Sequence, residues 1–76
     1  MMKKEEFLTA LEDILQREKP CAEGDNLADY DEWDSLSKMA LMAYFDRNFG
    51  IKITLNQMGE FRTVTDLMAL AGDKIQ

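Results

Sequence analysis

The chain has 76 residues, of which 46% are hydrophobic and 32% are charged, and its formal net charge is −6. A chain of this length buries only about 60% of the surface that its unfolded form exposes, so we expect residues 1–76 to form a single domain with a simple core. The composition is that of a globular domain and argues against disorder. With no histidine and with Cys21 as its one cysteine, the chain lacks the residues for serine–histidine or cysteine–histidine catalysis, a zinc site or an internal disulfide. We therefore expect no enzyme activity from the chain itself.

We expect neither a membrane span nor a signal peptide in this chain. No stretch approaches the roughly 18 apolar residues of a membrane span, and the segment from Met1 to Glu6 lacks the apolar region of a signal peptide. A cytoplasmic monomer without stable membrane association is the resulting expectation.

The first predicted element is an amphipathic helix over about residues 3–18. Its apolar residues recur at helical spacing and are Phe7, Leu8, Leu11, Ile14 and Leu15. Pro20 disfavours helical geometry at Lys19, so the helix should end there.

A long connection, residues 20–33, follows, and Leu27 and Tyr30 are its expected anchors to the core. A loop of this length in a small domain is usually functional or mobile. Its acidic residues do not fit a calcium loop, because a loop starting at Asp29 has Ala40 at the twelfth position, where a bidentate glutamate belongs.

The excess negative charge is concentrated in this connection. Residues 1–21 have four basic and five acidic side chains, and residues 35–76 have five basic and four acidic ones. Residues 22–34 contain no basic residue and six acidic ones: Glu23, Asp25, Asp29, Asp31, Glu32 and Asp34. Such a field repels nucleic acid and attracts basic protein surfaces; the alternative is that the acids only keep the loop solvated.

The second helix is predicted over about residues 35–49, with Asp34 as its N-cap. Ser35 then occupies the first helical position and faces outward. The unpaired amides and the positive end of the helix dipole would stabilise a phosphate esterified to its hydroxyl.

This helix has two apolar stripes where a surface helix needs one. The first should face the core and comprises Leu41, Met42, Phe45 and Phe49. The second comprises Leu36, Met39 and Ala43, and we interpret it as an exposed docking surface. The alternative is that Met39 packs beneath the long loop.

Gly50 suits the end of the second helix, and Ile51 and Ile53 after it should point into the core. Two further helices are predicted beyond this segment. Thr54 opens a short helix through about Phe61 with a capping box. Thr63 opens a final amphipathic helix with a second capping box, and the apolar residues of this helix are Val64, Leu67, Met68, Ala71 and Ile75.

The chain resembles the acyl carrier protein family over nearly its whole length. The resemblance rests on the triplet Asp34-Ser35-Leu36, the apolar helix that follows it and the segment from Phe49 to Ile53. The resemblance implies an all-α fold, a small four-helix bundle of three main helices and one short helix with a long first loop. It also implies 4′-phosphopantetheine attached covalently to Ser35, carrying acyl or aminoacyl groups as thioesters. Asp34 and Leu36 complete the triplet that a phosphopantetheinyl transferase recognises.

The resemblance further implies partners that load and transfer the cargo, with Leu36, Met39 and Ala43 at positions that touch them. Ser37, Ala40 and Arg47 stand where fatty-acid-synthesis carriers commonly have acidic residues. The set of partners should differ accordingly. Trp33 before the triplet and the extended acidic loop look more like those of stand-alone carriers in specialised pathways, or of peptidyl-carrier-like domains. Our hypothesis is that the acidic field has moved to the loop, where the steering residues are Asp29, Asp31 and Glu32.

Two other classes remain as alternatives. One is an unmodified adaptor with the carrier fold that binds partner proteins through Leu36, Met39 and the acidic loop. The other is an acidic mimic of nucleic acid, although its charge is too localised to match an extended phosphate track. The sequence leaves the cargo open among acyl, aminoacyl and polyketide-type groups.

Overall fold

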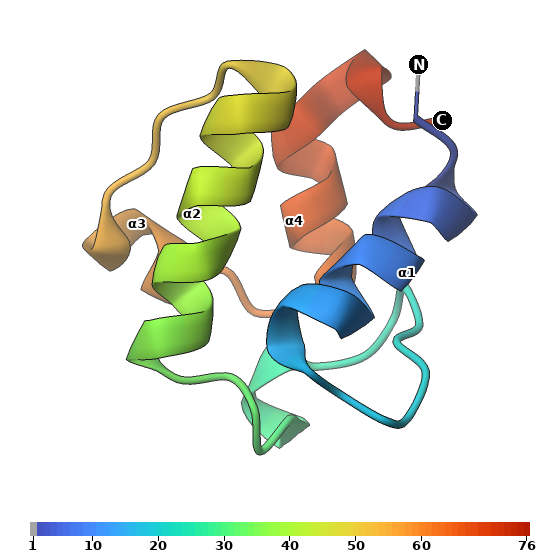
Figure 1. The fold of residues 1–76 in the computed structure, drawn as a ribbon, viewed down its shortest axis with the longest axis vertical. Helices are drawn as coiled ribbons and strands as arrows, with labels where there is room; N and C mark the ends of the chain where they lie inside the picture. The colour runs from blue at the N-terminus through green and yellow to red at the C-terminus, as the bar shows by residue number, and fades with distance from the viewer. Residues whose placement is uncertain (1) are drawn as a thin grey trace.

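The computed structural model describes residues 2–76. Met1, where the segment begins in which we expect no signal peptide, lies outside the described residues. Four α-helices follow one another in the described chain: α1 (Lys4–Leu15), α2 (Ser35–Phe49), α3 (Leu55–Glu60) and α4 (Val64–Ala71). Two single turns of 3₁₀ helix, η1 (Leu27–Asp29) and η2 (Gly72–Lys74), complete the order. The predicted all-α bundle of three main helices and one short helix is confirmed (Figure 1).

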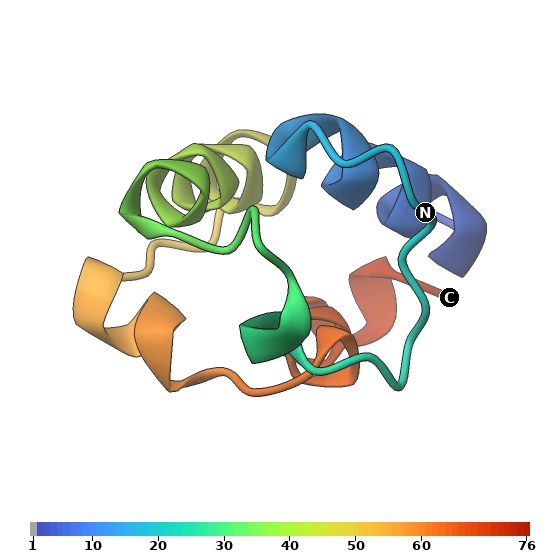
Figure 2. The same ribbon diagram turned by 90° about the horizontal axis from the view of Figure 1, so that it is seen from below.

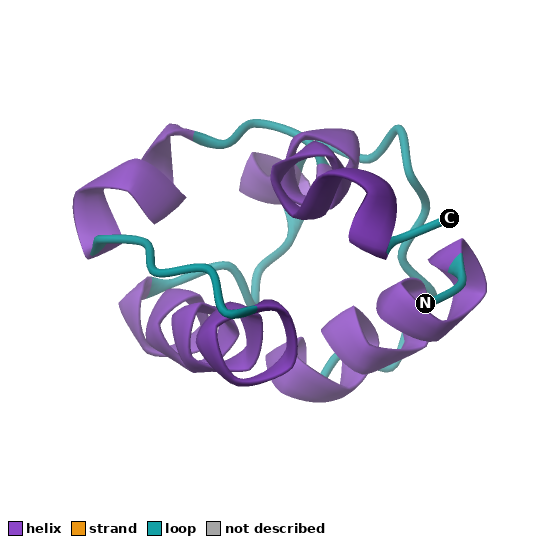
Figure 3. Cartoon of the chain, turned by 90° about the horizontal axis from the view of Figure 1, so that it is seen from above, coloured by secondary structure: helices purple, strands orange, loops and turns teal. Residues whose placement is uncertain are grey.

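The helices form two layers, with α1 and α2 in one and α3 and α4 in the other (Figures 2 and 3). The ends of the described chain lie together, where Met2 and Ile75 form a parallel bridge. The Met2 amide donates to the Lys74 carbonyl at 3.1 Å, and the Gln76 amide donates to the Met2 carbonyl at 2.8 Å. Backbone hydrogen bonds therefore join the two ends of the described chain.

Helix α1 is shorter than its periodicity predicts, since it ends at Leu15 and not near residue 18. Gln16 adopts the left-handed conformation with φ of 55°. The Arg17 amide then donates to the Glu12 carbonyl at 2.9 Å, which satisfies one of the last helical carbonyls. This turn, four residues before Pro20, ends the helix and directs Arg17 toward the loop.

The core is centred on Phe45, which has no exposed surface. Its ring centroid lies 5.4 Å from that of Phe49 and 6.0 Å from that of Phe7, in tilted arrangements that favour aromatic contact. Leu41 is buried on the same stripe and Met42 is half-buried, so the predicted core face of α2 is confirmed. The segment after α2 packs at the edge of this core, with half-buried side chains at Ile51 and Ile53.

Leu27 and Tyr30 are both buried, as predicted for the two anchors of the long connection. The backbone of this connection also pairs with the chain just before and at the start of α4. The Leu27 amide donates to the Arg62 carbonyl at 2.8 Å, and the Val64 amide donates to the Asp25 carbonyl at 3.1 Å. These hydrogen bonds attach the connection to the start of α4 before the chain continues into α2.

The capping boxes predicted at Thr54 and Thr63 are present and open α3 and α4. The prediction that the final helix continues to Ile75 is wrong, because α4 ends at Ala71. Gly72 takes a positive φ of 61° there, and η2 follows. Ile75 is buried through its extended pairing with Met2 and not through a helical face.

Candidate functional site

Ser35 is the first residue of α2, as its sequence context predicts, and its side chain is exposed. Asp34 precedes it in an extended conformation and serves as the N-cap. The Asp34 carboxylate accepts a hydrogen bond from the Ser37 amide at 2.9 Å, which lowers the pKa of Asp34 below its ordinary value. A charged cap therefore holds the first turn in place and leaves the Ser35 hydroxyl facing solvent.

Ser37 completes this cap. Its hydroxyl accepts from the Asp34 amide at 3.0 Å and donates to the Asp34 carbonyl at 3.0 Å. Only 8% of Ser37 is exposed. The two serines of the chain thus differ sharply, since Ser37 is buried and committed to the cap whereas Ser35 is open to an approaching enzyme.

The second stripe of α2 is exposed, as interpreted from the sequence. Leu36 is 75% exposed, Met39 is 49% exposed, and Ala43 is also at the surface. The alternative in which Met39 packs beneath the long loop is wrong. These three residues, here called the apolar ridge, start beside Ser35 and run along α2.

A groove of about 660 Å³ lies next to the ridge, between the end of α1 and the start of α2. We call it the α1–α2 groove. Its apolar lining consists of Ile14, Leu15, Leu36, Met39 and Ala40. Its polar lining consists of Gln16, Glu32, Asp34 and Ser37.

The six loop acids are not equivalent. Glu32 accepts a hydrogen bond from Arg17 at 2.9 Å, which compensates its charge. The pKa of Glu32 is lowered first by its own backbone amide and then by this contact with Arg17. Asp25 accepts a hydrogen bond from the Tyr30 hydroxyl at 2.7 Å, which lowers the pKa of Asp25. Asp29 and Asp31 are exposed. Of the three acids expected to steer partner proteins, Glu32 is compensated by Arg17, and Asp29 and Asp31 are the exposed ones.

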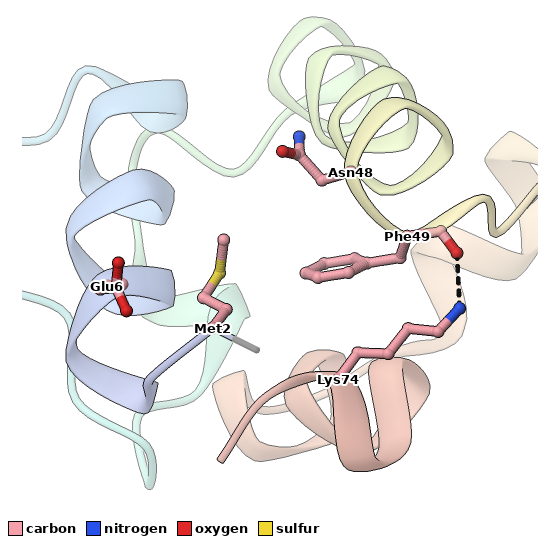
Figure 4. Close-up of a pocket in the computed structure, with 5 residues that line it drawn as sticks. All are labelled: Met2, Glu6, Asn48, Phe49 and Lys74. Atoms are coloured by element: carbon pink, nitrogen blue, oxygen red, sulfur yellow. Dashed lines mark hydrogen bonds between the residues drawn. The ribbon is translucent and has the colours of Figure 1, made fainter.

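A second hollow, of about 470 Å³, lies at the far end of α2 from Ser35 (Figure 4). Met2, Glu6, Asn48, Phe49 and Lys74 line it. Lys74 donates to the Phe49 carbonyl at 2.7 Å. A cation at this position satisfies a terminal carbonyl and complements the negative end of the helix dipole. This hollow therefore belongs to the C-terminal end of α2 and is remote from Ser35.

Two residues of the site were missed by the sequence reasoning. Ser37 was noted only as a departure from a family pattern, although Asp and Ser three residues apart at a helix start are a variant of the capping box. Arg17 had no recognisable signal, because its partners Glu32 and Tyr30 are distant in sequence.

The structure is an all-α bundle with one exposed serine at a capped helix start. Residues 5–71 match the family model described as phosphopantetheine attachment site, and the chain belongs to this family. Members bind 4′-phosphopantetheine covalently on a serine and are carriers and not catalysts. No curated protein and no solved structure matches the chain significantly. Within residues 2–76, no helix is long and apolar enough to cross a lipid bilayer.

Proposed function

We propose that the protein is an acyl carrier protein in which Ser35 is the attachment residue for 4′-phosphopantetheine. The observation that carries the assignment is the contrast between the two serines of the chain. Ser35 is exposed at the first position of α2, whereas the Ser37 hydroxyl is buried and bonded twice to the backbone of Asp34. Members of the family carry the group on a serine, and Ser35 is the serine of this chain that a modifying enzyme can reach.

The residues around Ser35 fit such a group. The start of α2 offers unpaired backbone amides and the positive end of the helix dipole, and both favour a phosphodiester. Asp34 fixes the helix start through Ser37, and Leu36 presents an exposed apolar side chain directly after the attachment position. When attached, 4′-phosphopantetheine supplies a thiol that holds acyl or aminoacyl cargo as a thioester.

The apolar ridge is the surface that we assign to partner enzymes, which are the phosphopantetheinyl transferase and the enzymes that load and transfer cargo. Exposed apolar patches of this kind mark interaction sites, and a methionine adapts to differently shaped partners. Asp29 and Asp31 add an exposed negative field on the loop that precedes α2. This field would steer a basic partner surface toward Ser35.

The test is the intact mass of the protein after incubation with coenzyme A and a broad-specificity phosphopantetheinyl transferase. The parent protein should gain one phosphopantetheine arm, Ser35→Ala should gain none, and Ser37→Ala should still gain one. A parent protein that gains no mass would contradict the proposal and favour the unmodified adaptor. A gain that persists in Ser35→Ala and disappears in Ser37→Ala would contradict the assignment of the residue.

A further inference from the structure

The methionines of the described chain differ sharply in how much of each residue solvent reaches. Met39 is 49% exposed, whereas Met2 and Met42 are half-buried. Met58 and Met68 lie in the core and are 0% and 7% exposed. A dissolved oxidant has to reach the thioether sulfur, so Met39 is the most accessible methionine target among residues 2–76.

Two further sulfur atoms are protected by their surroundings. The Met2 sulfur accepts a hydrogen bond from the Tyr44 hydroxyl at 3.3 Å, which occupies one of its lone pairs. Cys21 is 6% exposed, and burial raises the pKa of its thiol. Since the thiolate is the reactive form of cysteine, Cys21 is a poor target at neutral pH. These surroundings favour Met39 as the first sulfur that an oxidant reaches.

Met39 also lies where a partner enzyme has to dock. Ser35 and Met39 are four residues apart in α2, so their side chains are neighbours on one face of the helix. Leu36 and Ala43 flank Met39 in the apolar ridge, and both are exposed. An enzyme that reaches the Ser35 hydroxyl therefore covers the Met39 sulfur.

Oxidation of this thioether by a peroxide would place a polar group in the middle of the ridge. One peroxide oxygen bonds to the sulfur as the O–O bond breaks, and with hydrogen peroxide the other oxygen leaves as water. The sulfur loses two electrons, and the peroxide gains them. The sulfoxide oxygen accepts hydrogen bonds, but the apolar side chains of Leu36 and Ala43 offer it no donor. Covering this oxygen with an apolar partner surface costs free energy.

We propose that the Met39 thioether is a modification site that peroxides oxidise to the sulfoxide, and that this single oxygen weakens the docking of partner enzymes at Ser35. The inference rests on the proposed function and adds a redox dependence to it. The modification is reversible, because methionine sulfoxide reductases return the sulfoxide to the thioether.

The experiment uses full-length protein with an unmodified Ser35, treated with hydrogen peroxide for increasing times and then freed of the oxidant. Fragment masses of the digested protein locate the first added oxygen, which should be on Met39. The transferase reaction with coenzyme A is then measured over a range of protein concentrations. Oxidation should lower kcat/KM about fivefold or more, the rate equivalent of covering a polar oxygen that finds no partner. The change should lie in KM, as expected for weaker docking, and a reductase should restore the rate.

Matched variants separate Met39 from the other sulfurs, each compared with its own untreated sample. Met39→Leu keeps an apolar side chain of similar volume without the sulfur, so peroxide should no longer change its rate. Met42→Leu removes a half-buried thioether of the same helix and should leave the peroxide effect at the size seen in the parent. Met39→Gln places a polar group on the ridge without any oxidant and should be modified more slowly than Met39→Leu.

Urea unfolding of the singly oxidised protein separates a docking effect from damage to the core. Met39 is at the surface, so the free energy of unfolding should stay within about 0.5 kcal/mol of that of the untreated protein. A slower reaction that is accompanied by a larger loss of stability would assign the effect to a buried sulfur and overturn the proposal.

The remaining outcomes distinguish this inference from the proposed function. A first oxygen on Met2, Met42 or Cys21 would overturn the assignment of the site. An unchanged rate for protein oxidised at Met39 would overturn the docking effect and leave the carrier function intact. An untreated parent protein that gains no mass would overturn the proposed function together with the docking effect, whereas the site of oxidation is decided by the fragment masses alone.

Discussion

The guanidinium carbon of Arg17 lies 3.9 Å from the centroid of the Tyr30 ring. Arg17 also donates to Glu32, so one side chain just past α1 holds two positions of the connection that leads to Ser35. The Arg17 side chain is 14% exposed, which strengthens both contacts relative to a surface ion pair. The start of α2 is thereby positioned against the end of α1.

Replacing Arg17 by methionine should loosen the end of this connection while keeping an aliphatic side chain over Tyr30. The Trp33 amide, which donates to the Tyr30 carbonyl at 3.1 Å, should exchange faster with deuterium because the segment loses its anchor. Lys4→Met is the control, since it removes the same charge from an ion pair whose side chains are about half exposed. Equal exchange in both variants would contradict the anchoring role of Arg17.

The cap of α2 predicts opposite phenotypes for the two serines. Ser37→Ala removes the acceptor of the Asp34 amide and should lower the free energy of unfolding by about 1 kcal/mol, the usual contribution of such a hydrogen bond. Ser35→Ala changes an exposed side chain and should stay within about 0.5 kcal/mol of the parent. Urea unfolding measures both, and a larger loss for Ser35→Ala would refute this account of the cap.

Phe45 should be the most sensitive position of the core. Phe45→Ala removes a fully buried ring with three aromatic neighbours and should cost about 3–5 kcal/mol. That loss is large against the total stability of about 5–15 kcal/mol for a typical domain. Leu55→Ala, at a position that is 40% exposed, is the comparison and should have a small effect. An unchanged melting temperature in Phe45→Ala would show that the core is assigned incorrectly.

The exposed loop acids should affect the rate of modification and not the fold. The double variant Asp29→Asn, Asp31→Asn should be modified more slowly at low salt, and the difference should shrink above about 0.1 M salt, where the screening length is about 10 Å. Asp13→Asn, Asp73→Asn removes the same charge from exposed positions outside the loop and is the control. Identical low-salt rates for the two double variants would exclude local steering.

Asp66 should link stability to pH. Its carboxylate accepts hydrogen bonds from the amides of Arg62 and Thr63, at 3.0 Å and 3.1 Å, which lowers its pKa. The unfolded chain binds this proton at higher pH than the folded chain does, so the stabilisation is present above about pH 3.9 and is lost as the pH falls through the folded pKa.

Asp66→Asn should therefore be less stable than the parent at neutral pH, and the difference should shrink toward about pH 3. Urea unfolding at both pH values measures it. Asp73→Asn, which removes the same charge from an exposed position, is the matched comparison. A difference for Asp66→Asn that does not change with pH would mean that the carboxylate charge is not what stabilises the start of α4.

The sequence by itself determined the parts of the protein that depend on neighbours in the chain. The start of α2 at Ser35, the capping boxes at Thr54 and Thr63 and the two apolar stripes of α2 follow from contacts within one or two helical turns. Leu27 and Tyr30 are also predictable as anchors, because they are large apolar residues within a polar connection. Local hydrogen bonding and periodicity are readable because both partners lie in the same short segment.

Only the tertiary structure decided the features whose partners are far apart in sequence. Helix α1 ends at Leu15, where Arg17 turns toward Glu32 and Tyr30, and Ile75 leaves the helical pattern to pair with Met2. The same holds for the α1–α2 groove, whose walls meet only when the two helices pack. Helical periodicity reports how apolar side chains are spaced, but the choice between one more helical turn and a contact across the bundle depends on what that contact buries.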